Sequence, residues 1–179
     1  MKRVARRAPW SMAPTSSLNL KRAEDADKVF LIRQMNVILQ MEGNFLASYD
    51  LVLEKVTDDA IVEPIRRFRG DHERHVLDVT AAIEEMGGVP FEAVGPSPAF
   101  EVELDMMRRA GGVDELLAYF EIGERQSVWL YDAARSLPGI PSEVNDVLER
   151  ALQDENQHHA WAVARLGTVR AAPVDQGQR

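Results

Sequence analysis

Apolar residues recur at spacings of three and four along most of this chain, which is typical of amphipathic helices that pack on one core. The pattern predicts four long helices: residues 25–56, a second from a cap at Thr57-Asp58-Asp59 to Gly87-Gly88, residues 113–136, and a fourth from Ser142 to Gly167. Pro64 places a helix breaker near the start of the second. No segment alternates as a strand would, so we expect an all-α fold.

The connection between the second and third helices is long and rich in proline and glycine. Within residues 89–112, Ser97-Pro98 is a plausible cap and first turn for a short helix that ends near Arg108-Arg109. A connection of this length can cross a whole bundle. We therefore expect a four-helix bundle made of two antiparallel hairpins joined by a long crossover with a short helix.

Composition limits the possible chemistry. The 179 residues, 45% of them hydrophobic, suit a single domain. Because the chain has no cysteine, any metal must be held by nitrogen and oxygen. No apolar run approaches the roughly 20 residues of a membrane span, so we expect a cytoplasmic protein that does not enter the membrane.

Charge is distributed unevenly. The formal net charge is −8, yet residues 1–22 hold six of the 21 Lys and Arg and no acid. We expect a disordered basic tail over 1–22, the bundle over 23–168 and a disordered C-terminal tail over 169–179. The acidic body makes nucleic-acid binding improbable except through the basic tail.

Polar residues interrupt the apolar stripes at corresponding places in both hairpins. Glu42 precedes His75 by 33 residues, and Glu124 precedes His158 by 34. Both glutamates lie within a stripe, where a carboxylate without a partner would lose several kcal/mol of hydration. His72 with His75, and Glu155 with His158, share one helix face by their spacing of three. Metal binding gives all of these groups a partner.

The segment Asp154-Glu155-Asn156-Gln157-His158 resembles the Glu-x-x-His motif of ferritins, bacterioferritins and rubrerythrins, and Glu42-x6-Tyr49 resembles their first helix. The run from Glu121 to Tyr131 is similar to the third helix of a less characterised bacterial ferritin-like group. The resemblance covers about residues 25–167 and implies a site for two iron or manganese ions. It implies these metal ligands: Glu42, His72, His75, Glu124, Glu155 and His158.

His72 departs from that family pattern, because it stands where a bridging glutamate is expected and a neutral imidazole offers a single lone pair. Asp71 or Glu121 could supply the missing oxygen in a dinuclear site; a mononuclear site or tetrahedral zinc are the alternatives. His159 is placed on the flank. Tyr49 and Tyr131 are expected to donate hydrogen bonds that orient the carboxylates.

Two functional hypotheses follow. In the first, the protein binds iron, with manganese or zinc as alternatives, and the resemblance implies redox or oxidative-stress chemistry with oxygen or peroxide, of a ferroxidase- or peroxidase-like kind. In the second, the protein is a metal-free helical bundle that serves as a structural or partner-binding module and dimerises through Phe91 and Phe100. Under either hypothesis, we expect the protein to be a homodimer or a higher homo-oligomer.

Overall fold

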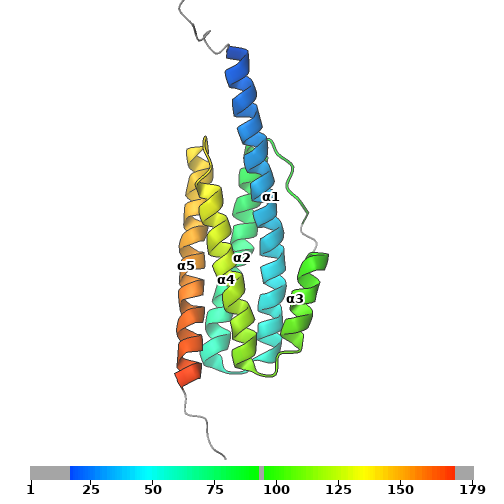
Figure 1. The fold of residues 1–179 in the computed structure, drawn as a ribbon, viewed down its shortest axis with the longest axis vertical. Coiled ribbons are helices and arrows are strands. Elements are labelled where there is room, and N and C mark those ends of the chain that lie inside the picture. Colours follow the sequence, from blue (N-terminus) through cyan, green and yellow to red (C-terminus); the bar gives the residue numbers. More distant parts are fainter. Residues whose placement is uncertain (1–16, 93–94, 172–179) are drawn as a thin grey trace, which may run out of the picture.

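The computed structural model describes residues 17–92 and 95–171, and these form a helical bundle without strands. Four long helices lie side by side and a short fifth helix lies outside them (Figure 1). The helices are α1 (Ser17–Lys55), α2 (Asp59–Glu85), α3 (Pro98–Arg108), α4 (Val113–Arg135) and α5 (Ser142–Ala171). The predicted all-α bundle of two hairpins with a crossover helix is confirmed.

Two helices are longer than their apolar stripes predicted. Helix α1 begins at Ser17, eight residues before the predicted start, and its first turns extend past the end of the bundle (Figure 1). Helix α5 continues to Ala171, four residues beyond Gly167. The predicted bounds followed the apolar stripes and did not include these turns. Of the predicted tails, residues 1–16 and 172–179 lie outside the described residues.

Helix α2 carries two elements of the site, and local chemistry fixes both of its ends. The Asp58 side chain accepts a hydrogen bond from the Ala60 amide at 3.0 Å, as an N-cap does. The helix runs through Pro64 without a break. At the other end Gly87 takes a φ of +71°, which ends the helix where the sequence predicted.

The crossover returns along the outside of α1, from the end of α2 to the opposite end of the bundle, where α4 begins (Figure 1). Three amide side chains spaced four apart on α1 bind its backbone: Asn36 with Val89, Gln40 with Gly95, and Asn44 with Ser97. Lys55 then donates to the carbonyls of Met107 and Arg108 at the end of α3. Helix α3 is therefore attached to α1 at both of its ends.

Helix α3 adds Leu104 and Met107 to the common core. Phe100 is half-buried, and its ring packs edge-on against Phe45 with centroids 6.3 Å apart. The prediction that Phe100 is an exposed dimerisation residue was therefore wrong, whereas Phe91 is 55% exposed. Among the described residues, every helix is too short or too polar to cross a membrane.

Candidate metal centre

Six polar side chains meet inside the bundle. One comes from α1, two from α2, one from α4 and two from α5, and none is more than 2% exposed. They are Glu42, His72, His75, Glu124, Glu155 and His158. These are the six residues that the resemblance implied as ligands, and we call them the polar cluster.

Two tyrosines brace the cluster between α1 and α4. Tyr49 on α1 donates to Glu124 on α4, and Tyr131 on α4 donates to Glu42 on α1, each at 2.6 Å. Burial, followed by the neighbouring carboxylates, raises the pKa of both phenols well above the ordinary value. Each tyrosine therefore stays protonated. Oε2 of Glu124 is left without a hydrogen-bond partner, whereas Oε2 of Glu42 is bonded to His72.

Two aspartates brace the cluster in the same way between α2 and α5. Nε2 of His75 lies 3.3 Å from Asp154 Oδ2, and Nε2 of His158 lies 3.1 Å from Asp71 Oδ2. An imidazole whose Nε2–H is held by a carboxylate presents Nδ1 to its other side, which is the usual arrangement of a metal-binding histidine. In both histidines Nδ1 faces the cluster.

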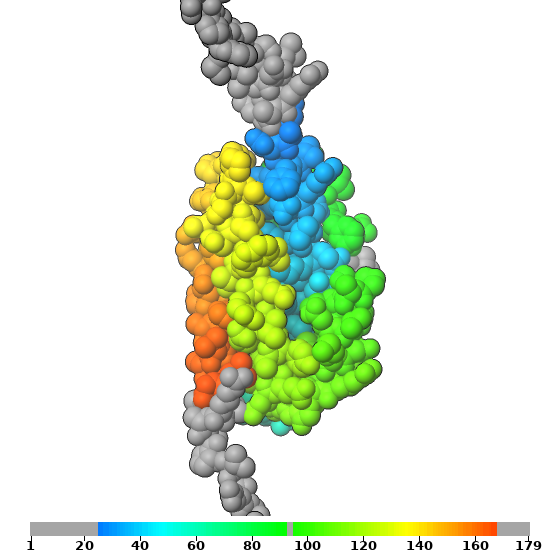
Figure 2. Space-filling model, in the orientation of Figure 1, coloured from blue at the N-terminus to red at the C-terminus, as the bar shows by residue number. Residues whose placement is uncertain are grey.

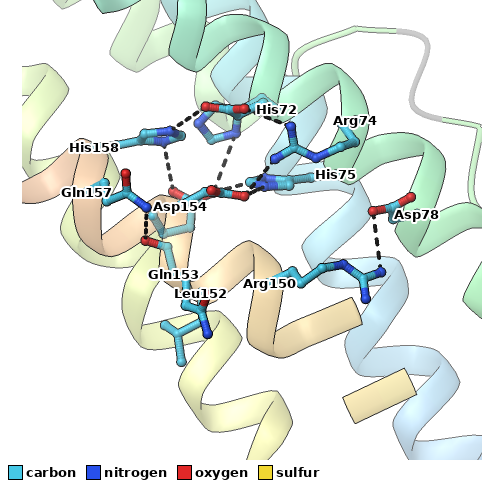
Figure 3. A network of polar contacts seen from close by, with 12 residues as sticks. His72, Arg74, His75, Asp78, Arg150, Leu152, Gln153, Asp154, Gln157 and His158 are labelled. Carbon is cyan, nitrogen blue, oxygen red and sulfur yellow. Dashed lines mark hydrogen bonds and ion pairs between the residues drawn. The ribbon is translucent and has the colours of Figure 1, made fainter. Parts of the chain in front are cut away.

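Arg74 joins these two aspartates at the surface. Its guanidinium donates to Asp71 at 2.8 Å. It also donates to Asp154 at 2.6 Å (Figure 3). Sequence reasoning did not find Arg74 or Asp154, although the repeated Asp-x-x-x-His spacing of 71–75 and 154–158 was visible. Each aspartate directly precedes an inward-facing residue, so it lies at the rim of the cluster.

Inside the cluster, several buried atoms face one another without forming hydrogen bonds. They are Nδ1 of His75, Nδ1 of His158, Oε2 of Glu124 and both carboxylate oxygens of Glu155. Glu155 Oε1 lies 3.2 Å from His75 Nδ1, and Glu155 Oε2 lies 3.8 Å from His158 Nδ1. Buried polar atoms without partners are rare in folded proteins and call for an explanation.

The separations between the candidate ligand atoms lie at or slightly above those between two ligands of one metal ion. His75 Nδ1 is 3.7 Å from Glu42 Oε1, and His158 Nδ1 is 3.5 Å from Glu124 Oε2. Two ligands bound at about 2.0–2.2 Å to one ion lie about 3–3.5 Å apart. The cluster forms two groups whose candidate ligand atoms all lie within 4.8 Å of one another: Glu42, His72, His75 and Glu155, and His72, Glu124, Glu155 and His158. Each group could therefore hold a metal ion, and His72 and Glu155 belong to both groups.

His72 belongs to both groups but is already bonded at both ring nitrogens. Its Nδ1 lies 2.6 Å from Glu42 Oε2, and its Nε2 lies 3.1 Å from the Tyr49 hydroxyl. The Tyr49 proton is directed at Glu124, so Nε2 of His72 must donate to the tyrosine oxygen. Burial disfavours the charged ring, but Glu155 and Glu42 outweigh it and raise the pKa of His72. His72 is thus a cation in the metal-free protein.

The other histidines share this electrostatic environment. Burial opposes their protonation, but Glu155 and Glu42 raise the pKa of His75 to about 11, and Glu124 and Glu155 raise that of His158 to about 10. In turn, the imidazoles hold the pKa of Glu155 well below its ordinary range despite burial. Glu42 shares this lowered pKa, whereas burial raises the pKa of Glu124. Without metal, protonated imidazoles therefore offset the charge of the buried carboxylates.

The stability of the metal-free protein should fall as pH rises from neutrality. A histidine whose folded pKa is raised contributes stability that is complete below the unfolded value of about 6.5 and is lost as pH rises toward 10–11. Each histidine contributes at most about 1.4 kcal/mol per pH unit in that window. Urea unfolding at pH 6.5 and pH 9 with a chelator present tests this. Equal midpoints would contradict it.

The remaining candidates lie outside both groups. Asp71 contacts Nε2 of His158 from the rim and belongs to neither group. Glu121 Oε1 accepts from His159 Nε2 at 3.0 Å, and both side chains are partly exposed on the flank. Tyr49 and Tyr131 hydrogen-bond to the glutamates of the opposite helix.

Comparison with known proteins agrees with this architecture. No protein-family model and no curated protein matches the chain. Among solved structures, the chain is similar to Rhodobacter capsulatus bacterioferritin, with a TM-score of 0.65 and 18% sequence identity over 79% of this chain and 86% of that one. That structure is described as having a metal-free dinuclear site and a heme iron. An identity this low relates the two by fold alone, and the chain accordingly has the ferritin-like fold.

Proposed function

We propose that this protein binds two iron ions in the polar cluster and uses them in redox chemistry with dioxygen or peroxide. The observation that carries the proposal is the position of Glu155. Its two oxygens face the Nδ1 atoms of two different histidines at 3.2 and 3.8 Å, and no well-aligned hydrogen bond joins either pair. A carboxylate placed in this way is suited to bridging two cations.

In this proposal, Glu42 and His75 would hold one ion, Glu124 and His158 would hold the other, and Glu155 would contribute to both. Donors made only of carboxylate and imidazole suit iron or manganese, and zinc is the alternative. Bound iron would supply electron transfer to an oxidant. The phenols of Tyr49 and Tyr131 keep the terminal glutamates oriented, and the packed bundle excludes bulk water.

The bacterioferritin likeness supports this proposal because that protein is described with a dinuclear site, although the chains share only the fold. One observation favours the alternative of a metal-free bundle. His72 donates from both ring nitrogens, so it supplies positive charge at the centre of the cluster without any metal. The two proposals therefore differ in one respect: in the first, metal ions replace the protons on the histidines of the cluster, and in the second, the histidines keep them.

Elemental mass spectrometry of protein expressed in iron- and manganese-supplemented medium tests the proposal. We expect about two ions per chain, with iron as the main metal. Anaerobic titration of the chelated protein with iron(II) should give the same stoichiometry and release protons from the histidines. One ion per chain would favour a mononuclear site. No metal under any supplementation would favour the metal-free bundle.

A further inference from the structure

The polar cluster is closed to solvent, since its side chains are at most 2% exposed. A small molecule that reacts with a metal bound there must therefore pass between packed side chains. The walls of the cluster differ in chemistry. On the side of α2 and α5 the wall consists of the ion pairs between Arg74, Asp71 and Asp154. An uncharged molecule would have to separate these pairs in order to pass.

The opposite wall, under α3, contains two adjoining cavities between α1, α3 and α4. The inner cavity has a volume of about 40 Å³ and is bounded by Phe45, Phe120 and Gly123. The outer cavity, of about 160 Å³, shares Phe45, Phe100 and Glu103 with it. In Figure 2 the side chains of α3 lie beside those of α1 and α4 on this face.

The Phe45 ring separates the inner cavity from His72, and the rings of Phe120 and Tyr49 together separate it from Glu124. The Phe45 ring lies 5.5 Å from the His72 ring, centroid to centroid. Phe120 lies 4.8 Å from Tyr49, which donates to Glu124. The cavity therefore comes within one side chain of both candidate metal groups.

Gly123 makes room for this arrangement. A Cβ added there would lie 2.7 Å from Cε1 of Phe45, closer than side-chain atoms pack. Glycine inside a helix costs about 1 kcal/mol relative to alanine, and Gly123 lies within α4. Its φ is not in the left-handed region, so backbone conformation does not require glycine. Its role is to let the Phe45 ring lie directly against the backbone of α4.

The residues that line the two cavities indicate which molecules could pass through them to the polar cluster. Of the residues that line the two cavities, Glu103 alone is charged, and the inner wall is aromatic. A metal ion would lose its hydration there without gaining ligands, whereas a small uncharged molecule would not. We propose that dioxygen or hydrogen peroxide reaches the metal centre through this cavity, by displacement of the Phe45 ring. This inference rests on the proposed function and names the route and class of its oxidant.

Xenon tests the cavity without any metal, because apolar cavities of this kind bind it. In NMR spectra of the metal-free protein under xenon pressure, we expect shifts at Phe45, Phe100 and Gly123. Gly123→Ala should abolish these shifts, since its methyl group and the displaced ring fill the space. If xenon leaves these residues unperturbed in the wild-type protein, the inference is wrong whatever the protein binds.

Stopped-flow oxidation of the iron(II)-loaded protein tests the route. Phe45→Leu should speed the reaction with dioxygen, and separately with peroxide, several-fold while the iron stoichiometry stays the same. Phe68→Leu is the matched control, because Phe68 is equally buried and packs 4.2 Å from the ring of His158. Equal acceleration by both variants would mean general loosening and would overturn the inference. If the wild-type protein binds no iron, the proposed function fails, and the xenon result alone decides whether the cavity admits small molecules.

Discussion

Glu155→Ala is expected to remove both metal ions, from about two per chain to none. Glu155 is the only carboxylate that belongs to both candidate groups in the described part of the chain. Each ion would keep one terminal glutamate and one histidine, and the two cations would lose the anion between them. Loss of an outer partner of a ligand already costs about 10–100-fold in affinity, so loss of a shared ligand should cost more.

Elemental analysis and iron(II) titration measure this effect, and two matched variants make it specific. Glu121→Ala removes an acid that the sequence also suggested but that lies on the flank with His159, so it should keep both ions. Glu42→Ala should lose mainly the ion on the His75 side. The prediction fails if Glu155→Ala and Glu121→Ala retain equal amounts of metal.

The sequence predicted the helices well because burial imposes the helical period directly on the chain. It also predicted which polar residues meet, since Glu42, Glu124 and Glu155 lie in the apolar stripes and therefore face the core. The family motif that this chain resembles has two ligands three residues apart on one helix, and the chain has polar residues at the same spacing. The helices and their inward-facing residues could be predicted because both depend only on the period of one helix.

Contacts between helices could not be predicted in the same way. Tyr49 follows Glu42 by two turns on α1, yet it binds Glu124 on α4, and this choice depends on the relative height and rotation of the helices. Asp71 is one residue from His72, which rotates it by about 100° around the helix, so it binds His158 from the rim. The amides of α1 that hold the crossover carry no periodic apolar signal.

His72→Glu is expected to strengthen metal binding and to destabilise the metal-free protein. In the metal-free cluster, the pKa of His72 is raised by Glu155 and Glu42, and the ring donates to both Glu42 and Tyr49. The substitution exchanges the central cation for an anion. The charge of the metal-free cluster then becomes more negative by two in a buried environment, where uncompensated charge is costly.

Two divalent ions reverse this balance, because their four positive charges equal those of four carboxylates once the histidines are neutral. In the wild-type protein, metal must instead displace the protons of His72, or leave that residue as a donor to Glu42. We therefore expect the second iron(II) to bind at least about tenfold more tightly in His72→Glu, a difference of about 1.4 kcal/mol. Competition with a chelator at fixed pH measures it.

The matched control is His72→Gln, which removes the cation without adding a carboxylate. It should lower metal-free stability, because Glu42 loses its charged partner, but it should not bring the same gain in affinity for the second ion. Urea unfolding with chelator and with iron(II) separates the two effects. If His72→Glu binds metal no better than His72→Gln, the charge at position 72 does not limit how much metal the polar cluster binds. The cluster would then be a hydrogen-bonded core that uses His72 in place of a metal.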